Sequence, residues 1–456
     1  METTETVKEN KMGVEPIGKL LLTMSTPMMV SMLVQAMYNI VDSVFVAMLS
    51  EDALTAVSLA FPIQNLMISF GVGTGVGVNS LVSRHLGEKK FDRANSVAVH
   101  GLRLAAIHYV IFAVLIVLIA KPFFSVQTDD PTIVSYGVTY TTIVGICGVG
   151  MFAQTMLEKI LTSTGKTFFA MITQLAGAIT NIIMDPLLIF GIGPFPKMGV
   201  AGAALATIFG QILGSSIAVY LNVFHNREIT ISFRESKFSP EIVSSIYGIG
   251  IPSIFMSAVG SIMTFGLNKI LVSFSSTAVA VFGVYFKLQS FAFMPVFGLN
   301  NGMMPIVSYN YGAANPKRIM QTIRIATITA VALLWTCFGI FQLFPAKLLL
   351  LFSASENMLS IGVPALRIIS ISFLFAGISI VSISICQSMK HAQFGLIVSI
   401  SRQLLVLLPV AYFLSRFGRV ELVWWSFPVA ELVSLTMCLC FVRYVLNKEV
   451  KPLYNR

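Results

Sequence analysis

The segment SRHLGEKKFDRA at residues 83–94 recurs as SYNYGAANPKRI at residues 308–319, which is an offset of 225 residues. The same offset, without a gap, relates identical residues along much of the chain: Pro27 and Pro252, Gln64 and Gln289, Gly73 and Gly298, Ser83 and Ser308, Gly87 and Gly312, Arg93 and Arg318, Ser135 and Ser360, Gly137 and Gly362, Ser163 and Ser388. Two like halves in a membrane can rock around a central cavity and open it to each side in turn. The repeat therefore favours a transporter.

The composition places both halves in a membrane. Of the 456 residues, 56% are apolar and only 11% are charged, whereas an average soluble domain has about 25% charged residues. The apolar residues form runs of roughly 20, the length at which a helix crosses the hydrocarbon core. They do not alternate with polar residues as the strands of a transmembrane barrel do. We therefore expect an all-α integral membrane protein.

Twelve transmembrane helices are predicted, six in each half, and their even number puts both termini on one side. Because each half has six spans, the halves share one orientation, and a pseudo-two-fold axis along the membrane normal relates them. The expected organisation is an N-terminal tail (1–18), a first six-helix lobe (19–224), a linker (225–240), a second six-helix lobe (241–446) and a C-terminal tail (447–456). The tails and the linker are expected to be cytoplasmic.

The basic residues give the orientation. Of the 30 Lys and Arg residues, 21 lie at the tails, the linker and the connections on the same side, 5 lie at the opposite connections and 4 lie within spans. Cytoplasmic loops carry this excess in membrane proteins, so both termini are expected in the cytoplasm of a bacterium, below a multi-pass inner or plasma membrane. The net charge of +10 follows this topology and forms no patch, so no nucleic-acid partner is expected.

No motif for an enzyme or a cofactor was found. The five cysteines all fall in apolar runs, the five histidines are scattered, and the chain contains no HExxH, G-x-S-x-G or Walker motif. The first 18 residues lack the basic-then-apolar order of a cleaved signal peptide. We therefore expect no enzymatic activity, no cofactor and a first span that acts as its own insertion signal.

Two acids within spans are candidates for function, because an intramembrane carboxylate is costly unless it faces a cavity or a partner. Asp42 shares a helix face with Gln35, Tyr38 and Asn39, whereas Asp185 shares one with Gln174 and Asn181. Two structural alternatives stay open: Asp42 lies near the outer helix end, and Asp185 is tolerated beside the kink at Pro186. At the equivalent positions of the second half the residues are Leu267 and Val410, so only the first half carries the two acids.

Other charged residues lie within or near spans. Lys269, Lys287, Arg367 and Arg402 either snorkel toward the surface or pair with a partner. Lys287, beside Tyr285 and Phe286, is a candidate cavity residue. Glu431 is a weaker candidate, and Glu158 is expected near the cytoplasmic surface beside Lys159.

Together these features resemble the multidrug and toxic compound extrusion (MATE) family, over residues 15 to 447. The resemblance is carried by two six-helix halves, Pro27 before Asp42, the stretch NIIMDPLLIFG followed by GVAGAALAT, and the two connections quoted first. It is closest to the bacterial DinF-like and MepA-like branch. It implies an antiporter in which Na⁺ or H⁺ entry drives export of amphipathic, mostly cationic compounds. It further implies a cation site at Asp42, Asn181, Asp185 and Thr207, a tyrosine of that network at Tyr140, and a bend of the first span at Pro27.

The same residues bear on the coupling ion and on the alternative functions. Carboxylate, amide and hydroxyl oxygens suit a hard cation such as Na⁺, but the same acids are able to carry a proton. A lipid-linked oligosaccharide or lipid flippase of the same superfamily is the alternative, but its anionic substrate favours a basic cavity. A channel does not require a pair of lobes, of which only one carries the intramembrane acids. The expected partners are small organic cations, the coupling cation and membrane lipids, and the protein is expected to be a monomer.

Overall fold

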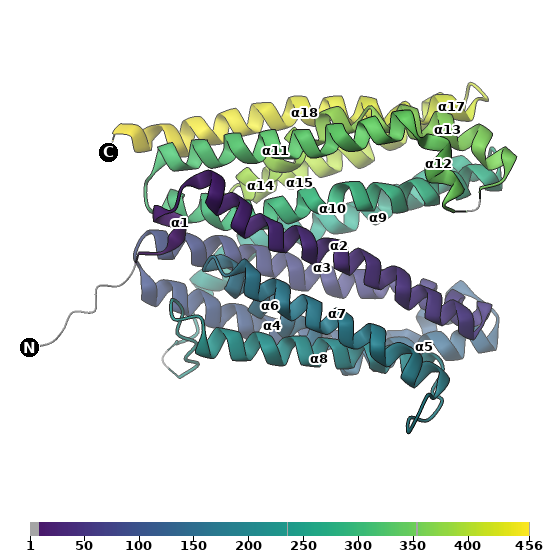
Figure 1. Ribbon diagram of the computed structural model, residues 1–456, viewed down its shortest axis with the longest axis horizontal. Helices are drawn as coiled ribbons and strands as arrows, with labels where there is room; N and C mark the ends of the chain where they lie inside the picture. The colour runs from purple at the N-terminus through teal and green to yellow at the C-terminus, as the bar shows by residue number, and fades with distance from the viewer. Residues whose placement is uncertain (1–8, 235, 353, 456) are drawn as a thin grey trace, which may run out of the picture.

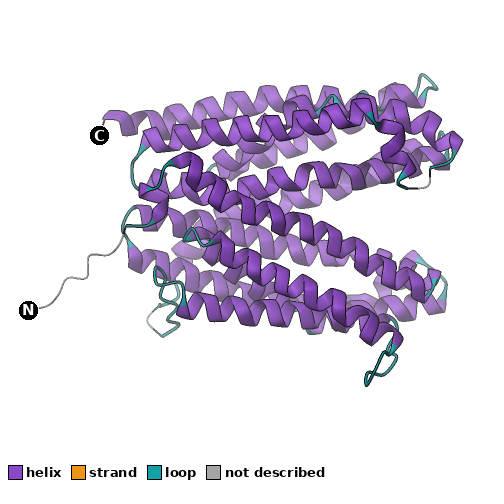
Figure 2. Ribbon diagram, in the orientation of Figure 1, coloured by secondary structure: helices purple, strands orange, loops and turns teal. Residues whose placement is uncertain are grey.

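The structure, a computed structural model, describes residues 9–234, 236–352 and 354–455. Two of the 21 basic residues expected on the cytoplasmic side, Lys8 and Arg456, lie outside the described residues, as do the rest of residues 1–8 and residue 235 of the linker. Within the described ranges the chain is built from helices and their connections, without a strand (Figure 2).

The first half contains a short helix and seven long ones. Their bounds are α1 (Lys11–Val14), α2 (Ile17–Leu49), α3 (Glu51–Gly87), α4 (Phe91–Gln127), α5 (Pro131–Ile146), α6 (Val149–Ser163), α7 (Thr167–Phe190) and α8 (Val200–Phe224). Side-chain caps start several of them: Ser50 accepts a hydrogen bond from the Ala53 backbone N–H at the start of α3, and Asp130 accepts from Thr132 and Ile133 at the start of α5.

The second half repeats this order with more interruptions. Its elements are α9 (Pro240–Val272), α10 (Ser276–Gly312), α11 (Pro316–Leu343), α12 (Pro345–Leu350), α13 (Glu356–Ser370), α14 (Phe373–Ser388), α15 (Ala392–Ile400), the π-helical η1 (Ser401–Leu407), α16 (Leu408–Ser415), α17 (Val420–Val423), α18 (Ser426–Val445), the π-helical η2 (Leu446–Val450) and the 3₁₀-helical η3 (Lys451–Asn455).

The described chain has ten helices long and apolar enough to cross a membrane, and two bent helix pairs bring the total to twelve when each pair counts as one span. This confirms the predicted all-α membrane fold. The bends were not predicted. α5 and α6 meet at 48° and α13 and α14 at 50°, and the two breaks, after Ile146 and after Ser370, lie at nearly equivalent positions of the repeat. Each half thus bends its fourth span at the same place.

The two halves meet along a seam of small residues, where their backbones approach closely. A Cβ atom on Gly87 of α3 would lie 1.9 Å from the carbonyl oxygen of Tyr309 in α10, and one on Gly312 would lie 2.0 Å from that of Arg84. Tyr309 is the repeat equivalent of Arg84, so the two contacts are reciprocal. Reciprocal contacts are what a two-fold axis produces, and glycine allows helices to pack this closely.

Hydrogen bonds across the seam gather at the end of the molecule where the termini lie. Ser80 and Ser308 hydroxyls are 3.3 Å apart, and Ser25 Oγ donates to the Leu299 carbonyl at 3.3 Å. The bond farthest from the termini joins Asn65 and Ser261 at 3.4 Å. Beyond it, the described residues form no hydrogen bond between the halves, and the two groups of helices splay apart (Figure 1). The structure is therefore closed at the termini and open at the other end.

Candidate functional site

A cavity of about 240 Å³ lies in the first half, between α2, α3, α6, α7 and α8. Three of the predicted cavity residues line it: Gln35 and Tyr38 from α2, and Gln174 from α7. Asn181 and Thr207 line it as well. Apolar side chains such as Met28, Met32 and Met151 complete the wall. The cavity thus combines an apolar wall with polar groups at defined positions.

Asp42 and Asp185 lie against each other at one side of this cavity. Asp42 follows Tyr38 by one turn of α2, Asp185 follows Asn181 by one turn of α7, and their carboxyl groups are within hydrogen-bonding contact. Asp185 is fully buried. One oxygen of each carboxyl group, Oδ1, is buried without a hydrogen-bond partner among the described residues. Two adjacent acids with unused oxygens are suited to hold a cation or a proton.

An amide and two hydroxyls surround the acids. The Asn181 amide lies 3.3 Å from Thr207 Oγ1; turned the other way, it donates to Asp185 Oδ2 at 3.2 Å and accepts from the Thr207 backbone N–H at 3.1 Å. Tyr140 enters from α5, and its hydroxyl accepts a hydrogen bond from Gln64 Nε2 at 3.1 Å. The structure therefore brings together the four residues that the resemblance assigned to the cation site. Tyr140 lies close enough to Asp42 and Asp185 to interact with their charges.

Pro27 lies inside α2, which continues unbroken from Ile17 to Leu49. Its ring has no N–H to donate to the carbonyl one turn earlier, at Thr23, so the helix lacks one hydrogen bond there. Pro27 is thus a position at which α2 is able to bend at a lower cost than elsewhere.

Asn39 and Lys287 are not brought into this site. Asn39 is exposed on α2, although its spacing puts it on the same helix face as Gln35 and Tyr38. Lys287 is exposed on α10, with its Nζ 6.0 Å from the centre of the Phe352 ring. Neither residue lines either of the two cavities described here.

Glu158 is buried, which the sequence interpretation missed. The residue, expected near the cytoplasmic surface, is 8% exposed and lines the first-half cavity. It accepts hydrogen bonds from Gln154 (2.9 Å), Thr173 (2.8 Å) and Gln174 (2.9 Å). The neighbouring Lys159 also lines the cavity and donates to Asn301 of the second half at 3.0 Å. The sequence indicates this burial only through possible hydrogen-bond donors: Gln154 one turn earlier, and Thr173 and Gln174 on the next helix.

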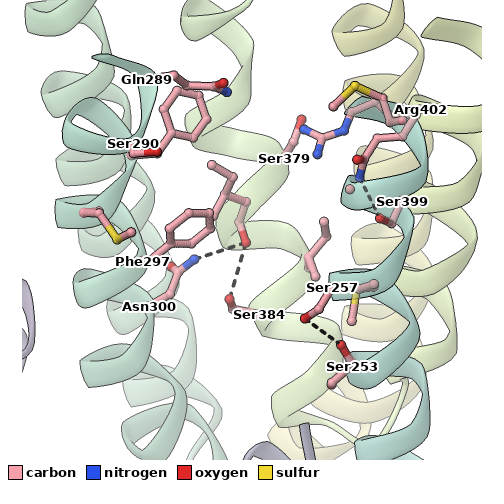
Figure 3. Close-up of a pocket in the computed structure, with 18 of the residues that line it drawn as sticks. Ser253, Ser257, Gln289, Ser290, Phe297, Asn300, Ser379, Ser384, Ser399 and Arg402 are labelled. Carbon is pink, nitrogen blue, oxygen red and sulfur yellow. Dashed lines mark hydrogen bonds between the residues drawn. The ribbon is translucent and has the colours of Figure 1, made fainter. Parts of the chain in front are cut away.

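A second cavity, of about 520 Å³, is lined mainly by the second half (Figure 3). Val72, Gly73 and Val76 of α3 complete its wall, and Val72 and Asn301 also line the first cavity, so the two cavities adjoin. The charged lining residues of this second cavity, among those described, are Arg402 of η1 and Glu431 of α18, whose Nη1 and Oε2 atoms are 3.1 Å apart. Serines and amides such as Ser253, Ser384, Asn300 and Gln403 share the wall with phenylalanines and methionines. This cavity therefore contains an ion pair where the first-half site contains adjacent acids.

Comparisons with known proteins agree on one family. The profile of the MatE family matches residues 27–187 and 252–413. The multidrug export protein MepA of Staphylococcus haemolyticus is 26% identical over 436 residues, 95% of this chain and 94% of its own. An FAD transporter of Shewanella oneidensis is 26% identical over 428 residues, 93% of this chain and 94% of its own. A solved multidrug resistance MATE family transporter of the MOP superfamily, in an outward-facing conformation, superposes with a TM-score of 0.91 at 25% identity, over 99% of this chain and 100% of that one.

Proposed function

This chain belongs to the MatE family, and on that premise we propose that it is an antiporter in which entry of Na⁺ or H⁺ drives the export of amphipathic, mostly cationic compounds. It is a multi-pass membrane protein, and the relatives reported above are named as transporters. The observation that carries the proposal is the contact between Asp42 and Asp185 beside a cavity of about 240 Å³.

The two acids supply the coupling step. Like charges in contact disfavour each other, and a bound cation or proton relieves that repulsion. Na⁺ is a hard cation that takes oxygen ligands, and Asp42, Asp185, Asn181 and Thr207 provide them. Cation binding then draws α2 toward α7, with the bend at Pro27.

The coupling ion and the exported compound compete because their sites share a wall. Tyr38, Asn181 and Thr207 line the cavity and also flank the two acids. When a cation pulls these side chains toward the carboxylates, the cavity changes shape and its compound is released. Nearby acids favour a cationic compound, and methionines adapt to ligands of different shapes.

The proposed orientation has cytoplasmic termini in a bacterial cytoplasmic membrane, as the positive-inside rule predicts. Because the seam is closed at the termini, the cavities of this state then face the outside. Cysteines placed at Ser50 and at Lys89 test the orientation. A membrane-impermeant thiol reagent should label the first in intact cells and the second only after permeabilisation, whereas the reverse pattern contradicts it.

Export of an anionic nucleotide cofactor is a second candidate, favoured by the FAD transporter of Shewanella oneidensis. We rank it second, because Asp42, Asp185 and Glu158 at the first-half site repel an anion.

Efflux from proteoliposomes tests the proposal. The purified protein is reconstituted with ethidium, or in parallel with FAD, and a Na⁺ gradient and a pH gradient are imposed separately. We expect one of the gradients to drive ethidium transport, and dissipating that gradient to stop it. Gradient-driven FAD transport without ethidium transport would establish the second candidate instead. Ethidium transport that ignores both gradients would contradict antiport.

A further inference from the structure

We propose that the second-half cavity is a second binding site, for zwitterionic amphiphiles whose ammonium group binds Glu431 and whose carboxylate binds Arg402. This site goes beyond the proposed function, because it takes a different chemical class of ligand, holds it with charged groups of the second half and requires no coupling ion. It adjoins the first-half cavity, with which it shares Val72 and Asn301.

The ion pair in the wall of this cavity has unused binding capacity. Glu431 is 5% exposed, and its Oε1 atom is buried without a hydrogen-bond partner among the described residues. A guanidinium has five N–H donors, but in the described structure Arg402 makes one hydrogen bond, from Nη1 to Glu431 Oε2. The hydroxyl of Tyr285, 1% exposed and also lining the cavity, has no partner either. An acceptor, a fork of donors and a hydroxyl thus remain available around one pair.

Charge balance selects the ligand class. Arg402 and Glu431 neutralise each other, so a cation or an anion alone adds an uncompensated charge to a site of low dielectric, which is costly. A zwitterion adds one charge of each sign. Its ammonium can meet Glu431 Oε1 and its carboxylate the free edge of the guanidinium, while the bond between Nη1 and Oε2 stays in place.

The local backbone brings Arg402 into position. Arg402 and Gln403 lie on η1, a π-helical turn of the kind that often occurs at functional sites. Pro409 follows it and cannot donate a backbone hydrogen bond, which loosens the preceding helical register. At the repeat-equivalent positions of the first half, α7 is a regular α-helix. Figure 3 shows Arg402 among the lining serines and amides of the cavity.

The rest of the cavity suits an aromatic body attached to the zwitterion. Phe293, Phe297, Met256 and Met294 contribute apolar and aromatic surface to the wall, and aromatic rings and thioethers pack favourably against a flat ring. The volume of about 520 Å³ falls in the range of small-molecule sites. The ligand is therefore a flat apolar group that carries an amino acid-like head.

Three dansyl probes with similar linkers separate the charge classes. Nε-dansyl-lysine carries an ammonium and a carboxylate, dansylcadaverine carries only the ammonium, and 6-(dansylamino)hexanoate carries only the carboxylate. Binding to the purified protein in nanodiscs is followed by dansyl fluorescence without any ion gradient, so that a failure of antiport does not affect the result.

The deciding variant is the double substitution Arg402→Gln/Glu431→Gln, which leaves no unpaired buried charge. We expect it to weaken Nε-dansyl-lysine binding at least about tenfold, as the loss of hydrogen bonds to charged groups implies. Binding of the two singly charged probes should change less than about threefold. Lys269→Gln, which removes an exposed basic residue of the same half that does not line the cavity, should leave all three unchanged.

The single variants assign the two ends of the ligand. Arg402→Gln should reduce the affinity for Nε-dansyl-lysine toward that for dansylcadaverine, and Glu431→Gln should reduce it toward that for the hexanoate. Thermal unfolding verifies that each variant is folded. Unchanged Nε-dansyl-lysine binding in a folded double variant, or an equal loss of all three probes, would overturn the proposal.

Discussion

The two halves of the molecule share a frame but not their charges. The seam glycines, the prolines at positions 27 and 252 and the bend in the fourth span recur at the repeat offset. The ionic groups do not recur. The residues equivalent to Asp42, Asp185 and Glu158 in the second half are Leu267, Val410 and Ile383. Likewise, the residues equivalent to Arg402 and Glu431 in the first half are Gly177 and Ala206. The two halves thus share the packing at the seam but differ in the charged residues that are proposed to bind ligands.

This contrast shows where symmetry is needed. Rocking of the two halves requires close packing on both sides of the axis, because each half moves against the equivalent surface of the other. Binding has no such requirement, and an intramembrane charge is costly. The buried acids therefore differ between the halves, each set lying beside a cavity.

The strongest test of the asymmetry is to neutralise the first-half acids. We expect Asp42→Asn and Asp185→Asn each to lower gradient-driven ethidium export at least about 100-fold, because each variant removes a carboxylate that is proposed to bind the coupling cation and the charge which that cation neutralises. Efflux from proteoliposomes measures this. Asp52→Asn, at an exposed acid of the same half, is the matched control and should export normally. Normal export by both variants would remove the coupling site from the first half.

The seam should instead respond symmetrically. Gly87→Val and Gly312→Val each place a side chain against a backbone carbonyl of the other half, and overpacking of this kind costs about 1–3 kcal/mol. We expect similar losses of thermal stability for both, measured by unfolding in detergent. Gly339→Val is the control, because a Cβ there meets nothing within 4 Å. A large loss in only one of the seam variants would show that the halves do not bear on each other equally.

Asn181 should have a smaller effect than the acids. Asn181→Ala removes an uncharged ligand and a hydrogen bond to Asp185, which is worth about 1.5 kcal/mol. The affinity for the coupling cation should fall about tenfold. The check is a titration of export rate against cation concentration, in which the maximal rate is kept. A lost maximal rate at saturating cation would assign Asn181 another role.

The smallest effect is expected in the second half. Glu431→Gln removes its buried acid but should change gradient-driven export of ethidium by less than about twofold, because Glu431 lies outside the first-half site. The measurement is the same proteoliposome efflux assay. If this variant lost coupling as completely as Asp42→Asn, the coupling ion would bind in both halves, and the asymmetry argued here would be wrong.

Periodicity and the repeat predicted the twelve spans, because an apolar run long enough to cross the bilayer has few alternatives to a helix. They did not predict the bends. Gly145, Gly148 and Gly150 surround the first bend, but the equivalent segment around Ser370 has no glycine at those positions. The second bend is therefore set by packing between helices, which a local sequence pattern does not report.

The site shows the same limit. Asp42 and Asp185 stand out because a lone acid in an apolar run has no local explanation. Glu158 does not stand out, because a lysine follows it near a helix end and suggests a solvated surface. Its burial depends on Thr173 and Gln174, which another helix brings to it. Only the tertiary structure shows that these donors replace water.

The splayed arrangement of the halves also has a mechanical consequence for the surrounding lipid. With the backbones in contact at the termini and apart at the other end (Figure 1), the molecule occupies more area in the leaflet away from the termini than in the leaflet beside them. The rocking motion expected of two such halves would move that area from one leaflet to the other. The lateral pressure of each leaflet would then do work on the transition, and the lipid composition of the membrane would be one of the factors that set the balance between the two states.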